Sequence, residues 1–293
     1  MNSEPLLRLG LAMWSQTQWK QSLYGDTPIS VRLEKYAQIF NTVEGNTTFY
    51  ALPKLATAMN WRDAVPDNFK FTFKLPKQIT HDLQLQNSQS DLNHFFKVMN
   101  PLIEKTALWK IQLPAKFGPS SLPVLEDFLQ QLPAHLHFGV EVRHQAFFSK
   151  GEAEKALNRL LIEHQCNRII MDSRPLFAAV PNNSVLIDAQ QKKPNVPVHP
   201  IATADQPVVR FIGQLDEEVN SVFFQKWCHK LAQWINEGKQ PLVFIHTPDN
   251  VYAPELAVRL NEMLRATVGL NELPKINLIE QPFNHPNQLD LLL

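Results

Sequence analysis

Residues 138–143 read Phe-Gly-Val-Glu-Val-Arg, a short apolar run that ends in charged side chains. Seven further runs of similar length occur along the chain, and most of them also end in polar residues. The eight predicted strands are Leu6–Leu11, Thr42–Glu44, Phe69–Leu75, Leu108–Leu113, Phe138–Val142, Arg168–Met171, Val208–Ile212 and Leu242–Ile245. Short apolar runs that alternate with longer amphipathic stretches are typical of repeated βα units.

The stretches between these runs place apolar residues at helical spacing, as in Leu92, Phe95 and Met99. Eight βα units in about 250 residues match the size of a (β/α)8 barrel. We therefore predict an α/β fold with one TIM-like barrel domain over residues 1–276 and an extended C-terminal tail over residues 277–293. A doubly wound open sheet is the structural alternative, but such a sheet rarely combines eight strands with so few glycines.

The longest stretch without a clear helical pattern is Ser173–Gln206, which is rich in proline. We predict that it forms a long loop after strand 6, in place of a regular sixth helix. Long loops in compact domains are usually either functional or disordered. In a barrel, this loop would lie over the carboxyl ends of the strands.

Composition narrows the classes of partner. The chain has 28 basic and 28 acidic side chains, so no overall field attracts it to nucleic acid or a membrane, and direct nucleic-acid binding would need a local patch. It has only 9 glycines and contains neither a Walker A loop nor a dinucleotide-binding fingerprint. Its two cysteines are too few for a disulfide framework. No apolar run approaches the roughly 20 residues of a membrane span, so we expect a soluble, cytoplasmic protein.

Several motifs resemble the YecE-like family, known as domain of unknown function 72. They are Val43–Tyr50 (V-E-G-N-T-T-F-Y), Phe71–His81 (F-T-F-K-L-P-K-Q-I-T-H), Gln112-Leu113-Pro114, Glu141-Val142-Arg143-His144 and Val209–Gly213. The resemblance implies a (β/α)8 barrel and no particular reaction, because no activity is assigned to the family. The chain departs from the family pattern at Gly45, where a branched apolar residue is usual, and at Ile212-Gly213, where a Leu-His-Gly run is usual.

Polar side chains at the strand ends predict the site. Residues two apart on a strand point to the same side, so Glu44 and Asn46 point together, as do Glu141 and Arg143. Barrel enzymes take their catalytic groups from the carboxyl ends of the strands, where these residues lie. The predicted catalytic residues are Glu44, Glu141 and Lys74, and the predicted substrate-binding residues are Asn46, Tyr50, His81, Gln112, Arg143 and Arg210.

The arginines at the strand ends indicate the class of substrate. Arginine forks recognise planar anions, so Arg143 and Arg210 predict a small substrate that bears a carboxylate or a phosphate. In the first hypothesis, two glutamates divide acid and base work on that substrate. A Schiff-base aldolase would need a desolvated lysine; Lys74 is a candidate, although its cationic surroundings equally suit a substrate clamp.

A second hypothesis is a metal-dependent phosphodiesterase or nuclease-like enzyme, in which the metal activates water. The candidate ligands of one or two divalent metals are Glu44, His81, Glu141, Asp172 and His246. No other cofactor is predicted. A third hypothesis is a non-catalytic ligand-binding or interaction barrel, in which the charged residues pair with one another.

The end of the chain suggests a partner. Gln288-Leu289-Asp290-Leu291-Leu292 resembles the short peptide by which bacterial polymerases and repair proteins bind the DNA sliding clamp. In that mode the glutamine fills a small polar pocket and the leucines enter a hydrophobic cleft. Pro282 and Pro286 keep the approach from becoming helical. The alternative is that the leucines pack against the barrel.

Overall fold

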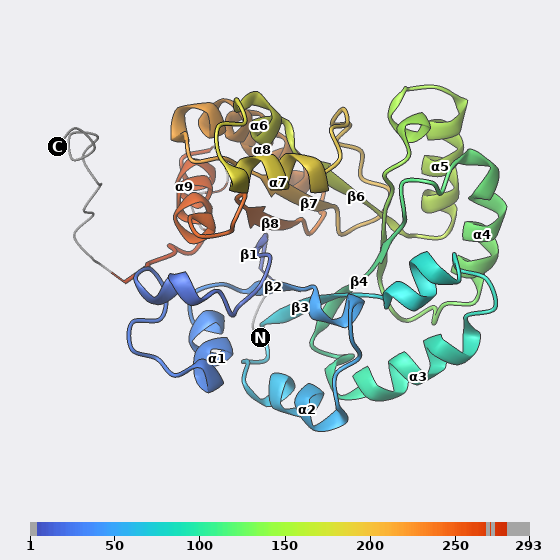
Figure 1. Ribbon diagram of the computed structural model, residues 1–293, viewed down its shortest axis with the longest axis horizontal. Coiled ribbons are helices and arrows are strands. Elements are labelled where there is room, and N and C mark those ends of the chain that lie inside the picture. The colour runs from blue at the N-terminus through green and yellow to red at the C-terminus, as the bar shows by residue number, and fades with distance from the viewer. Residues whose placement is uncertain (1–4, 268–269, 271–272, 280–293) are drawn as a thin grey trace.

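Eight parallel strands form a closed barrel in the computed structural model, which describes residues 5–267, 270 and 273–279 (Figure 1). The strands are β1 (Arg8–Leu11), β2 (Thr42–Gly45), β3 (Lys70–Lys74), β4 (Thr106–Gln112), β5 (Phe138–Glu141), β6 (Asn167–Asp172), β7 (Val208–Ile212) and β8 (Leu242–His246). Each strand pairs with the next in chain order, and β8 closes the ring by pairing with β1, with Gly10 opposite Phe244. The predicted (β/α)8 fold is confirmed.

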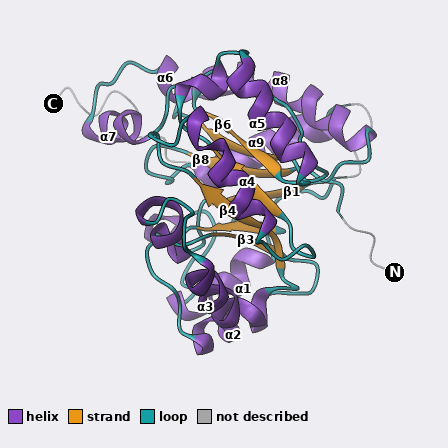
Figure 2. Ribbon diagram, turned by 90° about the vertical axis from the view of Figure 1, so that its right-hand side faces the viewer, coloured by secondary structure: helices purple, strands orange, loops and turns teal. Residues whose placement is uncertain are grey.

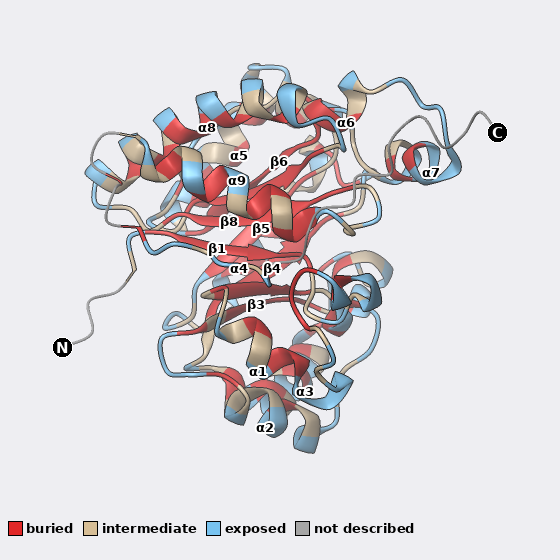
Figure 3. Ribbon diagram, turned by 90° about the vertical axis from the view of Figure 1, so that its left-hand side faces the viewer, coloured by how far each residue is buried: buried red, intermediate tan, exposed pale blue. Residues whose placement is uncertain are grey.

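Helices surround the barrel, as Figure 2 shows. They are α1 (Arg32–Ala37), α2 (Leu55–Asp63), α3 (Gln89–Met99), α4 (Leu122–Gln130), α5 (Glu152–Glu163), α6 (Arg174–Ala178), α7 (Ser184–Lys192), α8 (Glu217–Asn236) and α9 (Ala253–Arg265). The helical faces turned to the strands are buried and the opposite faces are exposed (Figure 3). Within the described residues, no helix has the length and apolar character needed to cross a membrane.

The main apolar core lies between the strands and the helices. Strand residues that point outward, such as Phe71, Phe73 and Trp109, pack there against one another. The ring centroids of Phe71 and Phe73 are 5.1 Å apart, and those of Phe73 and Trp109 are 5.8 Å apart. This layer accounts for the alternation in the strands, because every second residue contributes to it.

The barrel interior has its own small apolar cluster near the amino ends of the strands. It consists of Ala107, Leu108, Ile169, Val208, Leu242 and Phe244. Val208 and Leu242 are the first residues of β7 and β8, so this cluster fills the amino-terminal part of the interior. Nearer the carboxyl ends, the inward positions of most strands carry polar side chains, and these form the candidate site.

The connection after β6 differs from the predicted long loop because it contains α6 and α7. Leu176 and Leu186 of these helices are buried in a cluster with Met171 and Ile212 of the barrel, so burial of apolar side chains favours helix formation despite the prolines. The irregular part that follows is also anchored, since His199 Nδ1 lies 2.6 Å from Glu154 Oε1.

Candidate functional site

Arg210 links two buried glutamates at the centre of the site. Its Nε donates to Glu44 Oε1 at 2.7 Å, and its Nη2 donates to Glu44 Oε2 at 2.9 Å. Its Nη1 donates to Glu141 Oε2 at 2.7 Å. All three side chains are almost completely buried. Because each charge is paired and hydrogen-bonded, the arrangement can be stable inside the barrel.

Three further side chains contact Glu44. Lys110 Nζ lies 2.5 Å from Glu44 Oε1 as an ion pair. The Asn46 amide donates to Glu44 Oε2 at 2.8 Å and to the carbonyl oxygen of Ala12 at 2.9 Å. His246 Nε2 is 3.6 Å from Glu44 Oε2. Glu44 is therefore the most heavily contacted carboxylate of the site.

Both glutamates remain ionised at neutral pH. Burial alone would raise the pKa of Glu44, but Arg210 and then Lys110 outweigh it and hold the pKa well below its usual range. Burial also opposes ionisation of Glu141, and Arg210 followed by Arg143 lowers its pKa below the usual range. These carboxylates can therefore accept hydrogen bonds or a proton, but they hold no proton to donate.

Lys74 lies beside this network, and within the described part of the chain no carboxylate forms an ion pair with it. Its Nζ donates to Gln112 Oε1 at 2.8 Å and lies 5.6 Å from the centre of the Phe49 ring. Burial lowers the pKa of Lys74 well below its usual value, and the nearby Arg210 and Lys110 lower it further. This amine loses its proton more easily than an exposed lysine does.

Three buried polar atoms in the site meet no hydrogen-bond geometry with another described residue, although one of them, Lys110 Nζ, is in the ion pair with Glu44. The other two are Asn46 Oδ1 and His246 Nε2. Burial, followed by the charge of Arg210, holds the pKa of His246 well below its usual value, so the ring is neutral near pH 7. Unsatisfied buried polar atoms are rare in native proteins and often mark functional positions.

Two more cations adjoin the network. Arg143 Nη2 lies 2.9 Å from Glu141 Oε1, and its side chain is 23% exposed. Lys193 follows α7 directly and is half-buried. Burial and then Arg210 lower the pKa of Lys193 to about 8, while Glu141 and Glu44 oppose this shift. The charges of both glutamates therefore affect the pKa of Lys193, which lies in the connection after β6.

Most of the predicted site residues lie together in this polar cluster. They are Glu44, Asn46, Lys74, Gln112, Glu141, Arg143 and Arg210, and the candidate metal ligand His246 joins them. Tyr50 and His81 instead pack against Phe49, with ring centroids 5.1 and 5.0 Å from it. Tyr50 is 82% exposed, so these two side chains lie at the rim of the cluster.

Two residues of the cluster were not predicted. On β4, the neighbours of Lys110 (Trp109 and Ile111) point outward, so Lys110 points into the barrel together with Leu108 and Gln112. Strand alternation was therefore enough to predict that Lys110 lies inside the barrel. Lys193 lies in the irregular connection after α7. No local pattern in the sequence indicated that Lys193 would lie near enough to Arg210 and both glutamates for their charges to shift its pKa.

Asp172 does not join the predicted metal ligands. It accepts hydrogen bonds from Arg174 at 2.7 Å and from the Trp227 indole of α8 at 2.8 Å, so it points toward the helices. The inward residues of β6 are Ile169 and Met171. In the described part of the chain, no group of three or more His, Cys, Asp or Glu side chains is placed to hold a metal ion.

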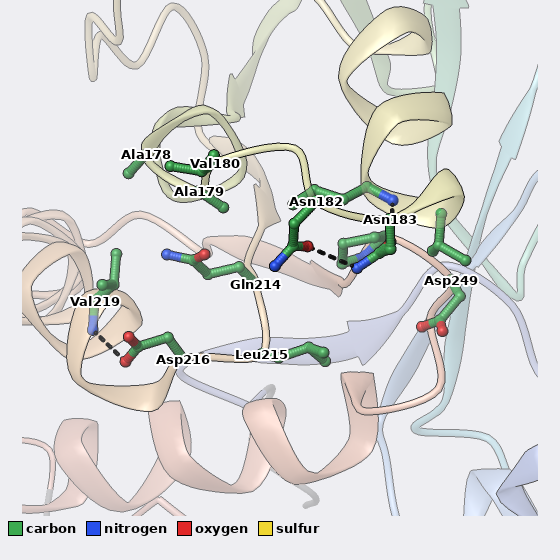
Figure 4. A pocket seen from close by; sticks show the side chains of 13 residues that line it. Ala178, Ala179, Val180, Asn182, Asn183, Gln214, Leu215, Asp216, Val219 and Asp249 are labelled. Atoms are coloured by element: carbon green, nitrogen blue, oxygen red, sulfur yellow. Dashed lines mark hydrogen bonds between the residues drawn. The ribbon is translucent and has the colours of Figure 1, made fainter. Parts of the chain in front are cut away.

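A separate cavity of about 540 Å³ lies at the same end of the barrel (Figure 4). Residues of α6 and α7, the loop between them, the start of α8 and the segments after β7 and β8 line it. They include Val180, Leu186, Gln214 and Asp249. None of its lining residues belongs to the polar cluster. The helix α7 connects the two features, because Leu186 lines the cavity and Lys193 follows the last turn.

The predicted partner-binding residues 288–292 lie outside the described residues. The described chain ends with Ile279, whose backbone N–H donates to the carbonyl oxygen of Ser22 at 2.9 Å. The sliding-clamp hypothesis therefore depends on the sequence motif.

Comparisons with known proteins agree with the fold. A family model described as "Protein of unknown function DUF72" matches residues 8–278. UPF0759 protein YecE of Escherichia coli K12 is 46% identical over 263 residues, which cover 90% of this chain and 94% of that protein. The protein of the same name from Escherichia coli O157:H7 has the same identity and coverage.

Two crystal structures of DUF72 family proteins share the architecture. The protein from Enterococcus faecalis V583 aligns with a TM-score of 0.70 at 21% identity, covering 92% of this chain and 98% of that chain. The protein from Thermotoga maritima MSB8 aligns with a TM-score of 0.67 at 23% identity, covering 88% of this chain and 99% of that chain. At these identities, the likeness concerns the fold alone.

Proposed function

The chain belongs to the DUF72 family, and we propose that it is an enzyme that acts on a small anionic substrate at the carboxyl end of its barrel. The substrate would bear a carboxylate or a phosphate. The polar cluster around Arg210 would bind it and carry out acid/base chemistry on it. In barrel enzymes this end holds the active site, which supports the location.

The observation that carries the proposal is the excess of cationic groups in the polar cluster. Apart from Lys74, whose pKa is lowered, four cationic side chains lie near two carboxylates, Glu44 and Glu141. The cations are Lys110, Arg143, Lys193 and Arg210. Both carboxylates are already bound by Arg210. A substrate anion would therefore complement positive charge that the cluster does not itself neutralise.

The groups of the cluster suit different parts of acid/base chemistry. Glu44 and Glu141 are ionised and would act as proton acceptors or as fixed negative charges. Burial lowers the pKa of Lys110 to about 8, even though Glu44 favours its charged form. A pKa near the working pH suits a group that gives and takes a proton, so Lys110 is a better proton donor than either glutamate.

Arg143→Met tests the anion-binding part of the proposal. Arg143 is partly exposed at the edge of the network, so its loss leaves the bonds of Arg210 to both glutamates in place. We expect calorimetry to show binding of inorganic phosphate or malonate to the native chain. A charge-assisted hydrogen bond contributes about 1.5–3 kcal/mol, so the variant should bind at least about tenfold more weakly.

Arg62→Met is the matched control. Arg62 pairs with Asp63 on α2 with a 2.7 Å contact between Nε and Oδ1, away from the cluster. Its replacement should leave anion affinity unchanged. Equal affinity in the native chain and the Arg143 variant would contradict the proposed anion site. Anion binding without turnover of any member of a carboxylate and phosphate ester library would favour a non-catalytic binding barrel.

A further inference from the structure

Lys74 and Lys110 form a cross-strand pair of buried lysines. The parallel strands β3 and β4 place their Cα positions opposite each other. The two residues are only 8% and 1% exposed. Two ammonium groups side by side in a buried environment repel each other, so one of them releases its proton more readily. A second cationic group next to a desolvated lysine is a known means of making the amine nucleophilic near neutral pH.

The partners of the two lysines show which one is the free amine. Lys110 Nζ is 2.5 Å from a carboxylate oxygen of Glu44, which favours its charged form. Lys74 Nζ donates to the neutral amide oxygen of Gln112 at 2.8 Å. Among the described residues, no carboxylate lies within ion-pair distance of Lys74. The uncharged amine is therefore expected at Lys74 and the retained proton at Lys110.

A structural role explains Lys74 poorly. Burial of an unpaired ammonium group costs several kcal/mol, and a lysine retained only to fill space would be better replaced by an apolar residue. As a neutral amine, Lys74 can donate to Gln112 and keep its nitrogen lone pair available. The lowered pKa of Lys74, caused first by burial and then by Arg210 and Lys110, agrees with this state.

We infer that Lys74 is a catalytic nucleophile that forms an imine with the carbonyl group of an anionic oxo substrate, such as a 2-oxo acid or a phosphorylated aldehyde. The inference rests on the proposed function, because the cationic groups of the cluster would hold the anionic part of that substrate. It narrows the substrate class from any small anion to one with an aldehyde or ketone group.

The covalent step begins with attack of the Lys74 Nζ lone pair on the carbonyl carbon. A C–N bond forms, and the carbonyl π electrons move to oxygen, which gains a proton. The nitrogen then releases a proton, and the hydroxyl group gains one and leaves as water while the C=N bond forms. In total, the amine, the carbonyl compound and one proton give an iminium ion and water. The iminium ion withdraws electrons from the adjacent carbon, which favours proton removal or C–C cleavage there.

Reductive trapping tests the inference on the full chain. The protein is incubated with glyoxylate, which is a small anionic aldehyde, or with pyruvate, then reduced with borohydride and analysed by peptide mass mapping. Each unit by which a lysine pKa is lowered gives about tenfold more free amine at neutral pH. We therefore expect Lys74 to be modified at least about tenfold faster than the exposed lysines. Prior addition of phosphate should slow its modification.

Three variants make the test specific. Lys74→Arg should show no adduct at this position, with circular dichroism confirming that it is folded. Lys70→Arg, at the other end of β3, should behave as the native chain, since Lys70 Nζ donates to the carbonyl oxygen of Glu104. Lys110→Met removes the neighbouring cation and should shift the pH midpoint of Lys74 modification upward. An unchanged midpoint would show that Lys110 does not lower the pKa of Lys74 and would contradict the coupled lysine pair on which the inference rests.

The outcomes separate the two proposals. Selective modification of Lys74 supports both the nucleophile and the anion site. If phosphate binds in calorimetry but Lys74 reacts no faster than exposed lysines, the nucleophile is wrong and the anion site stands. If neither phosphate nor malonate binds and Lys74 is not selectively modified, both proposals are wrong.

Discussion

Arg210 is the residue on which the candidate site depends most. It uses three nitrogen atoms to bind two buried carboxylates from β2 and β5, which are not adjacent in the barrel. Lysine could not replace it, because a single ammonium group lacks the planar fork that reaches two carboxylates at once. Loss of Arg210 would leave two buried negative charges with fewer partners. The anion-binding test therefore uses Arg143, whose loss does not disrupt this contact.

Glu141→Gln is expected to destabilise the protein by about 3 kcal/mol at neutral pH, because it removes one charge of a buried pair. The folded pKa of Glu141 is depressed, whereas the unfolded pKa is about 4.3. Below about pH 4 the unfolded state binds more protons than the folded state, so native stability falls with pH. The contribution of Glu141 is therefore complete above pH 4.3 and is lost as pH falls toward the folded pKa.

Urea denaturation of the native chain and the variant at about pH 7 and about pH 3 measures this effect. The difference in free energy of unfolding should be smaller at the lower pH. Glu152→Gln is the control, since Glu152 is exposed and pairs with Lys155, which is also exposed. A difference that does not change with pH would contradict an ionised, stabilising Glu141 in the folded state.

Strand alternation explains which site residues could be predicted. β2 and β5 have polar residues at every second position near their ends, so Glu44 and Glu141 were assigned correctly to the inside of the barrel. In β6 the residues Ile170 and Met171 are both apolar, and the alternation therefore does not reveal the direction of Asp172. Lys110 could have been predicted from alternation, whereas the position of Lys193 near the glutamates depends on how the connection after β6 folds.

At the scale of single elements, Gly45 of β2 shows how the chain accommodates a departure from its family pattern. A Cβ atom at Gly45 would lie 2.4 Å from the Phe73 ring of the neighbouring strand. That ring is fully buried and stacks on Trp61 with centroids 5.9 Å apart. The Phe73 ring thus occupies the space that a branched side chain at residue 45 would need.

Gly45→Val should destabilise the barrel by about 1–3 kcal/mol, because overpacking displaces side chains in a filled core. Phe73→Leu should relieve the clash, so the valine should cost less in that background. A double-mutant cycle of thermal or urea unfolding measures the coupling. Additive effects of the two substitutions would show that the Phe73 ring is not the reason for glycine at residue 45.

The connection after β6 shows the limit of element prediction from sequence. Its prolines indicated a long loop, but α6 and α7 form because Leu176 and Leu186 bury against the barrel. The segment that follows is held by a buried group: Arg168 Nη1 and His199 Nδ1 both contact Glu154 Oε1, at 2.9 and 2.6 Å. These contacts join residues far apart in sequence, so local periodicity could not predict them.

At the scale of the whole molecule, the repeat of eight βα units was enough to predict the closed barrel. Each strand hydrogen-bonds to its neighbours in chain order. The number and order of the strands therefore describe the arrangement of the closed barrel. The family resemblance implied the same architecture. The position of the site at the carboxyl ends of the strands follows from the fold. The reaction depends on side-chain geometry, which the number of βα units does not predict.

The whole molecule also includes the C-terminal residues that resemble a sliding-clamp-binding peptide. We expect deletion of residues 288–293 to abolish retention of the chain on an immobilised bacterial DNA sliding clamp, because the motif glutamine and leucines would be lost. The midpoint of thermal unfolding should not change, since the described residues already contain a closed barrel with its helices.

A full-length variant with Gln288→Ala and Leu291→Ala tests the same contact without shortening the chain, and it should lose retention equally. If both variants are retained as well as the native chain, the motif does not bind the clamp. A loss of about 1 kcal/mol shifts the unfolding midpoint of a large domain by only a few degrees. If the deletion lowers the midpoint by more than this, the leucines stabilise the fold by burying apolar surface. Retention and thermal unfolding together therefore decide whether these leucines serve a partner or the barrel itself.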